Sequence, residues 1–125
     1  MKYSVDSRNV MEPSNTIFYA LVGENNNGHD FVVALYNKGV RNFVLSERRE
    51  EYLSLEGASV RYVENTSATL QEDARLFSQG ITAQKVAITG SNGKTVVKEW
   101  IAQLMEGDLK LCRSPRSYNS QVGVP

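Results

Sequence analysis

The sequence predicts an α/β protein in which a small α/β domain is followed by the start of a second one. Short apolar runs alternate with helix-length amphipathic segments, and glycine or polar turns separate them, an order that is typical of parallel α/β folds. The chain has 125 residues, 41% of them hydrophobic, which suits a folded globular protein. A glycine turn between an apolar run and a helical pattern at residues 86–106 indicates that a new unit begins there.

The first domain is expected to span residues 1–82. Apolar runs predict its strands, at residues 17–22, 40–45 and 60–63. Helical spacing and end signals predict its helices, at residues 30–38 with Asp30 as the cap, at residues 47–54, and from Thr66 to a stop at Gly80. Residues 25–28, rich in asparagine, are expected to form a loop after the first of these strands.

The second domain is expected to cover residues 83–125. Its predicted elements are a strand at residues 86–88, a glycine turn at 90–93, a helix at 94–106 and a strand beginning at 109–112. These elements and a tail are too few for an independent sheet, so the domain is interpreted as incomplete. The helix has a face of large apolar side chains with no sheet to cover it, which predicts either self-association of the chain through residues 85–106 or weak order beyond residue 82.

Charge and composition exclude several classes of function. The formal net charge is zero, so neither nucleic acid nor an anionic membrane is an expected partner. No apolar run approaches the roughly 20 residues of a membrane span, and the N-terminus lacks the apolar core of a signal peptide. A single cysteine, Cys112, agrees with a cytoplasmic location. A catalytic role for Cys112 is disfavoured, because the one histidine, His29, is far away in sequence.

The strongest chemical signal is the segment T-G-S-N-G-K-T at residues 89–95. Glycines let backbone N–H groups approach phosphate oxygens, and a following helix directs its positive end at the same anion. Lys94 would reach the β- and γ-phosphates of ATP, and the Thr95 hydroxyl would bind Mg²⁺. The predicted ATP-phosphate-binding residues are Gly90, Ser91, Asn92, Gly93, Lys94, Thr95 and Val96.

The spacing of this loop departs from the general pattern G-x-x-x-x-G-K-[ST], because Ile88 stands where that pattern has glycine. An ordinary glycine turn followed by an exposed lysine is the alternative interpretation. The order of apolar run, glycine turn, Lys-Thr pair and amphipathic helix favours phosphate binding.

Three ordered blocks resemble the Mur ligases, which are ATP-dependent amide ligases of peptidoglycan synthesis. The shortened loop is also similar to that of folylpolyglutamate synthetases, with Val96 where a further threonine is common. The N-terminal block separates the two groups, because residues 6–8, 18–24 and 28–31 resemble a first Mur ligase domain that the synthetases lack. The third block, N-S-Q-V-G-V-P at residues 119–125, is similar to the N-x-x-x-G-V-P segment of Mur ligases.

Within the family, G-H-D-F at residues 28–31 and the final G-V-P resemble members that join D-alanyl-D-alanine to UDP-N-acetylmuramoyl-tripeptide. The alternatives are a member that adds the third residue of the peptide stem, and a non-enzymatic nucleotide-sugar-binding module. The Lys94-Thr95 pair argues against the binding module, which would not need a Mg²⁺ ligand. Residues 113–121 also resemble versions in which the ligase is fused ahead of an alanine racemase.

The resemblance implies a UDP-sugar site, whose predicted residues are Val5, Ser7, Arg8, Glu24, Asn25, Asn26, Asn119, Ser120 and Gln121. A turn capped by Asp6, with a surface ion pair to Arg8, is the alternative for the first of these segments. His29 is expected to be structural, and Tyr52, Tyr62 and Phe77 are expected to pack rather than to stack on a base.

The resemblance also implies a mechanism. ATP passes its γ-phosphate to the substrate's terminal carboxylate, and the incoming amine attacks the acyl phosphate to give the amide. The second Mg²⁺ ligand, a carbamylated lysine and the amine-binding domain of the family have no counterpart in residues 1–125. The chain alone is therefore expected to be inactive.

Overall fold

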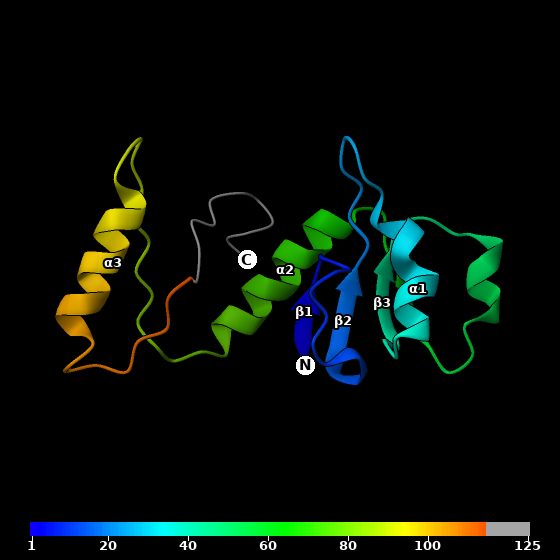
Figure 1. Cartoon of the computed structure of the whole chain (residues 1–125), viewed down its shortest axis with the longest axis horizontal. Coiled ribbons are helices and arrows are strands. Elements are labelled where there is room, and N and C mark those ends of the chain that lie inside the picture. Colours follow the sequence, from blue (N-terminus) through cyan, green and yellow to red (C-terminus); the bar gives the residue numbers. More distant parts are fainter. Residues whose placement is uncertain (115–125) are drawn as a thin grey trace.

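The computed structural model describes residues 1–114 and contains one parallel sheet with strands in sequence order (Figure 1). The strands are β1 (Lys2–Ser4), β2 (Thr16–Tyr19), β3 (Asn42–Leu45) and β4 (Ser59–Tyr62). The α-helices are α1 (Val32–Asn37), α2 (Thr66–Gln79) and α3 (Lys94–Met105). Short 3-10 helices are η1 (Pro13–Asn15), η2 (Gly28–Phe31) and η3 (Glu50–Ser54). The predicted α/β class is confirmed, with every neighbouring pair of strands parallel.

Both faces of the sheet are covered, because alternate side chains of a strand point to opposite faces. On one face, Phe18 and Phe43 belong to a buried cluster with residues of α1 and η3. On the other face, Tyr19 and Val44 pack against Leu70 of α2. α1 connects β2 to β3, and η3 lies in the connection from β3 to β4. Because connections between parallel strands share one handedness, both lie on the same face of the sheet, and α2 packs on the opposite face (Figure 1).

Two of the helical predictions are confirmed almost to the residue. α2 begins at Thr66, with the side chain of Asn65 accepting the N–H of Ala68, and ends at Gln79, with Gly80 as its C-cap. α3 begins at Lys94, directly after Gly93, and ends at Met105. In both cases strong local end signals coincide with helical spacing of apolar residues.

The start of α1 and the helix at residues 47–54 need correction. Asp30 does not cap α1, because Asn27 caps the preceding η2 and the Asp30 carboxylate instead accepts a 2.7 Å hydrogen bond from Arg49. At residues 47–54 the structure has only η3, since Glu47 and Arg49 are drawn into side-chain contacts before the helical turn begins.

The strand predictions after residue 82 are wrong for the described residues. Residues 86–88 and 109–112 have no strand conformation, because no other part of residues 1–114 forms a ladder with them. Val86 accordingly leaves 71% of its surface exposed. Conversely, β1 was not predicted, and it exists because its three residues pair with β2. Figure 1 shows α3 apart from the sheet, and the domain boundary near residue 82 stays a prediction.

Within residues 1–114, no helix has the length and apolar character that crossing a membrane requires.

Candidate functional site

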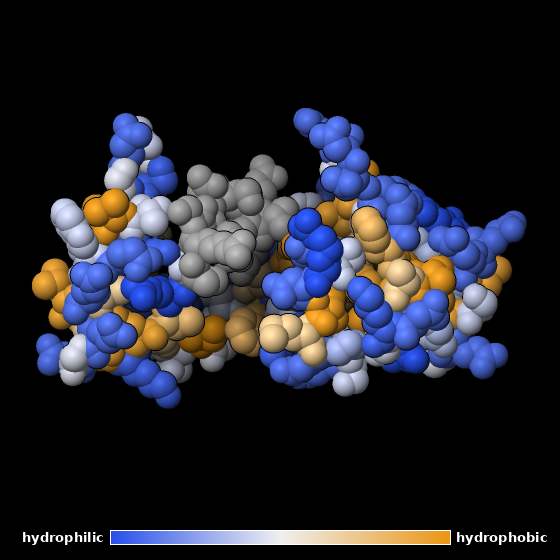
Figure 2. Space-filling view, in the orientation of Figure 1, coloured by the Kyte–Doolittle hydropathy of each residue, from blue (hydrophilic) through white to orange (hydrophobic). Residues whose placement is uncertain are grey.

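Two of the predicted substrate segments lie at the carboxyl edge of the sheet. β1 ends at Ser4 and β2 ends at Tyr19, and the two strands are parallel neighbours. Residues 5–8 and the loop at residues 21–27 therefore leave the sheet at the same edge, where ligands of open α/β sheets bind. Figure 1 shows the second loop projecting beyond the end of β2, and Figure 2 shows its tip covered by hydrophilic residues.

The turn after β1 adopts the ion-paired conformation that the sequence left as an alternative. Arg8 donates from Nε to Asp6 Oδ1 at 2.9 Å and from a terminal nitrogen to Asp6 Oδ2 at 3.0 Å. The same contacts hold the pKa of the Asp6 carboxyl below its usual value. The pair is exposed to solvent, so it contributes little to stability and a phosphate can compete for the guanidinium. Val5 is also exposed beside it.

The loop after β2 is a narrow hairpin. Val22 and Asn27 form an antiparallel bridge, and the N–H of Gly23 donates to the carbonyl of Asn26 at 2.9 Å. The N–H of Gly28 donates to the Leu21 carbonyl at 2.8 Å, which closes the hairpin at its base. The hairpin therefore lifts the exposed predicted ligands, Glu24, Asn25 and Asn26, away from the sheet.

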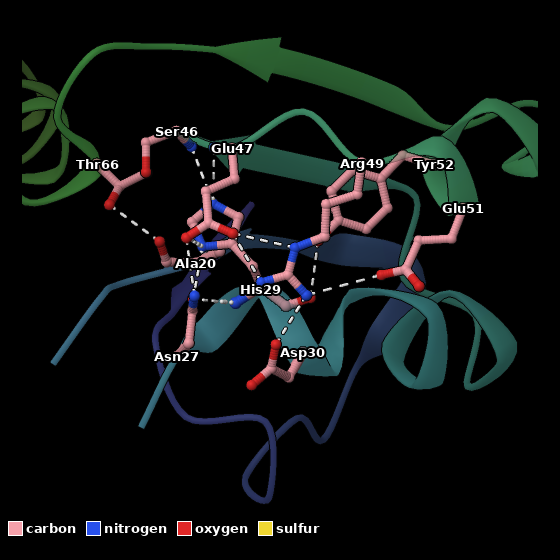
Figure 3. A network of polar contacts seen from close by, with 10 residues as sticks. All are labelled: Ala20, Asn27, His29, Asp30, Ser46, Glu47, Arg49, Glu51, Tyr52 and Thr66. Atoms are coloured by element: carbon pink, nitrogen blue, oxygen red, sulfur yellow. Dashed lines mark hydrogen bonds and ion pairs between the residues drawn. The ribbon is translucent and has the colours of Figure 1, made fainter. Parts of the chain in front are cut away.

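A buried polar cluster lies at the base of this hairpin (Figure 3). His29 is fully buried, as its predicted structural role requires, and its carbonyl accepts the Tyr52 hydroxyl at 2.8 Å. Burial lowers the pKa of His29 and raises the pKa of Tyr52 to about 12. On the other side of the hairpin base, the Thr66 hydroxyl donates to the Ala20 carbonyl at 2.9 Å.

Sequence reasoning missed Arg48 at this edge. Arg48 follows β3 and its guanidinium carbon lies 4.8 Å from the ring centroid of Tyr62, the last residue of β4. Arg49 beside it is neutralised by Glu47 and Asp30, whereas Arg48 forms no ion pair with a carboxylate of residues 1–114. Its position after a parallel strand is the signal that could have found it.

The glycine loop before α3 has the shape that phosphate binding needs. Gly93 has a φ of +77°, which side chains rarely adopt, and nothing lies within 4 Å of where its Cβ would stand. α3 starts immediately afterwards and directs the positive end of its dipole at the loop. Lys94 folds back so that Nζ donates to the Gly90 carbonyl, and it also approaches the Ser91 carbonyl at 3.4 Å.

The donor set fits ATP with Mg²⁺ in one respect. The Thr95 hydroxyl is an oxygen ligand of the kind Mg²⁺ prefers, and this ion is commonly held by one or two protein oxygens together with phosphates and water. Residues 1–114 contain no group of three or more histidine, cysteine or acidic side chains that could hold a metal without such help. A bound Mg²⁺ would neutralise charge on the phosphates.

Some predicted residues lie outside the site or outside the described chain. Asn119, Ser120 and Gln121 fall beyond residue 114 and so outside the described residues. Cys112 is an exposed free thiol, and His29 is buried in the first domain, so no Cys-His pair exists between them. Tyr52 packs in the core as predicted, and Phe77 packs edge-on against Tyr3 on the surface.

A separate hollow of about 420 Å³ lies on the α2 face of the sheet. Its lining runs from Ile17, Asn42 and Ser59 near the amino ends of the strands to Tyr19 and Val44, so it lies on a face of the sheet and includes neither residues 5–8 nor residues 21–27. A polar group borders it, in which Tyr19 donates to Asp73 at 2.7 Å and Arg61 pairs with the same carboxylate.

Known proteins match this chain in both sequence and fold. A UDP-N-acetylmuramoyl-tripeptide--D-alanyl-D-alanine ligase from Borreliella burgdorferi is 31% identical to this chain, and the match covers 98% of this chain and 28% of the length of that ligase. The ligase of the same name from Synechocystis is 32% identical to this chain, and the match covers 96% of this chain and 26% of the length of that ligase. The chain is a relative of the Mur ligases. It spans about a quarter of the length of these relatives, and no family model matches it.

Mur ligases of a second activity also match. A UDP-N-acetylmuramoyl-L-alanyl-D-glutamate--2,6-diaminopimelate ligase from Rickettsia felis is 32% identical to this chain, and the match covers 80% of this chain and 18% of the length of that ligase. Among solved structures, MurF from Acinetobacter baumannii matches 98% of the chain with a TM-score of 0.82 at 24% identity. A MurF ligase from Thermotoga maritima in complex with ADP matches equally far, with a TM-score of 0.81. These two structures show that the chain shares the fold of about a quarter of each of them.

Proposed function

We propose that the chain is the N-terminal part of an ATP-dependent amide ligase that adds D-alanyl-D-alanine to UDP-N-acetylmuramoyl-tripeptide in the cytoplasm. The observation that carries the proposal is the joint presence of two features suited to anions, the loops that leave β1 and β2 at the carboxyl edge of the sheet and the glycine turn at the start of α3. Relatives with this activity match nearly the whole chain, and one relative in fold was solved with ADP.

In this proposal the sheet edge receives the uridine and diphosphate of the substrate. Ser7 and the asparagines of the hairpin offer donors and acceptors to the uracil and ribose. Arg8 and Arg48 supply exposed guanidinium groups at the same edge, and bidentate contacts of this kind suit phosphate. Arg49 takes no part in phosphate binding, because its charge is already compensated by Glu47 and Asp30.

The glycine loop and α3 take the phosphates of ATP. The helix end and Lys94 stabilise charge that develops as the γ-phosphoryl group moves to the substrate carboxylate, and Thr95 would hold Mg²⁺. Binding requires Lys94 to leave the carbonyls of Gly90 and Ser91, since the ammonium group cannot serve both those oxygens and the phosphates fully. Such an exchange of contacts is accessible because the lysine head lies at the protein surface.

The substrate half of the proposal is tested by titrating the chain with UDP-N-acetylmuramic acid and following backbone amide signals by NMR. We expect the shifts to gather at Ser7, Asn25 and Arg48, and to leave Ile17 and Ser59 at the opposite edge unchanged. Shifts that gather at the 420 Å³ hollow instead, or none at millimolar ligand, would remove the sheet edge from the proposal.

The ATP half is tested in the full-length ligase with Lys94→Ala. Because Lys94 acts on the transferred phosphoryl group, amide formation should fall by about 10²-fold or more, while UDP-substrate binding stays nearly unchanged. Lys85→Ala is the matched control, since this lysine is also exposed but contacts the Ser78 carbonyl outside the loop. Turnover retained by Lys94→Ala would contradict the assignment.

A further inference from the structure

The imidazole of His29 joins the hairpin after β2 to the chain that leaves β3 (Figure 3). Nε2 accepts the backbone N–H of Ser46 at 3.0 Å and that of Glu47 at 3.1 Å. Since Nε2 accepts two hydrogen bonds, it carries no proton, and the proton of the neutral ring must sit on Nδ1. Nδ1 lies 2.8 Å from Asn27 Oδ1 and donates to it.

Asn27 extends this link through both polar atoms of its side chain. Its Oδ1 also accepts the backbone N–H of His29 at 3.0 Å, and its Nδ2 donates to Glu47 Oε1 at 2.8 Å. The other oxygen of Glu47 accepts two hydrogen bonds from Arg49, at 2.7 and 3.0 Å. Both ring nitrogens of His29 are therefore engaged within the protein, so the imidazole does not contact the substrate, while one N–H of the Asn27 amide lies outside these bonds.

The link fixes the position of the hairpin tip. Asn27 is the last residue of the hairpin and is bridged to Val22 at its start. Within the hairpin, the N–H of Gly23 donates to the Asn26 carbonyl, so the tip has few ways to move once Asn27 is held. The buried imidazole holds Asn27 through a hydrogen bond that water does not weaken, since His29 has no exposed surface.

We propose that His29 is a positioning residue: through Asn27 it holds residues 23–26 in the conformation that receives the uridine diphosphate part of the substrate, without touching it. This inference rests on the proposed function of the sheet edge. A hairpin that is ordered before binding loses less conformational freedom when the ligand arrives, and it therefore binds more tightly.

The inference predicts a specific pattern of binding by variants of the chain. His29→Gln cannot contact Ser46, Glu47 and Asn27 with the geometry of a ring, so uridine diphosphate should bind about fivefold to tenfold more weakly. Asn27→Ala removes the same hydrogen bonds at a partly exposed residue and keeps the buried imidazole, so it should weaken binding similarly. This second variant keeps the inference testable if His29→Gln fails to fold. Leu55→Ala is the control, because Leu55 is buried in the same core but belongs to the connection that enters β4.

Binding is measured by titration with uridine diphosphate at a temperature where circular dichroism shows every variant folded. Hydrogen exchange of the Gly23 and Gly28 amides is measured on the same samples, because a positioning role predicts local loss of protection in the hairpin before the strands lose theirs. We expect both effects in His29→Gln and Asn27→Ala and neither in Leu55→Ala.

Three other outcomes are informative. If wild-type chain binds and His29→Gln binds equally well while folded, the inference is overturned. It is also overturned if Leu55→Ala loses as much affinity, because general destabilisation then explains both variants. If wild-type chain does not bind uridine diphosphate, the proposed function of the edge fails, and unchanged Gly23 protection in His29→Gln would separately remove the positioning role.

Discussion

Gly23 in the hairpin and Gly28 at its base should differ strongly in their response to alanine. A Cβ at Gly28 would lie 2.7 Å from the Leu21 nitrogen and 2.9 Å from the Ala20 Cα. The shorter distance is roughly 0.8 Å inside the ordinary contact of about 3.5 Å. Backbone hydrogen bonds fix both neighbours, since the Leu21 carbonyl accepts from Gly28 and the Ala20 N–H donates to the Val44 carbonyl at 3.0 Å. The clash can be relieved only by moving the backbone.

We therefore expect Gly28→Ala to lower the free energy of unfolding by about 3 kcal/mol, the upper end of the range for overpacking. Gly23→Ala is the matched control. Its Cβ would lie 3.4 Å from the Asn26 carbonyl oxygen and its φ is not positive, so alanine fits there. Reduced freedom of the unfolded chain offsets small strain, and the net change should stay within about 1 kcal/mol.

Thermal unfolding followed by circular dichroism separates these cases. At about 4–8 °C per kcal/mol for a domain of this size, Gly28→Ala should lower Tm by roughly 12–24 °C. Urea unfolding at constant temperature checks the free energy directly. Equal losses in the two variants, or a loss under about 1 kcal/mol for Gly28→Ala, would show that the hairpin base is less tightly packed than the structure has it.

Three further predictions concern packing, pH and association. Thr66→Val should lower the free energy of unfolding, measured by urea titration, by about 1–3 kcal/mol, because it leaves the Ala20 carbonyl without its donor. Thr69→Val is the control and should lower the free energy of unfolding by less, because the hydrogen bond of Thr69 to the Asn65 carbonyl is exposed. Burial in the folded chain lowers the pKa of His29 below its ordinary value of 6.5. The stabilising contribution of His29 is therefore complete above pH 6.5 and declines as the pH falls toward the lower pKa of the folded chain. His29→Gln should flatten this pH dependence of the free energy of unfolding, measured between about pH 7 and pH 5. The chain should self-associate through α3, so Trp100→Glu should shift sedimentation toward the monomer and Leu53→Glu should not; a wild-type monomer at all concentrations would contradict this.

The sequence predicts those parts of the fold whose signals are local. α2 and α3 were found because each combines an end signal with helical spacing over more than ten residues. Strands depend instead on a partner. β1 has no apolar run and exists because β2 pairs with it, while residues 86–88 have the apolar run and lack a partner among residues 1–114. Apolar character alone therefore predicted a strand where none forms.

The candidate site shows the same division. The glycine loop is a local motif, and its geometry at Gly93 follows from the residue type. The residues of the sheet edge were assigned through resemblance, and their place together depends on the parallel pairing of β1 and β2. The hydrogen bonds that link Asn27 and His29 to Ser46 and Glu47 join positions about twenty residues apart, so no short sequence pattern reveals them. Arg48 was missed for a similar reason, because its role depends on Tyr62 in the next strand.

The two proposed anion sites differ in what holds them in shape. At the sheet edge, paired strands and a buried hydrogen-bonded histidine fix the backbone before any ligand arrives. At the glycine loop, the contacts are short-range, from Lys94 to carbonyls three and four residues away, while Trp100 and Leu104 of α3 leave 63% and 80% of their surfaces exposed. A helix held mainly by its own hydrogen bonds is marginal at this length, so its order depends on what packs against that face. Phosphate binding at α3 should therefore gain far more from burial of the apolar face than uridine diphosphate binding at the sheet edge, whose strands and covering helices all lie within residues 2–79.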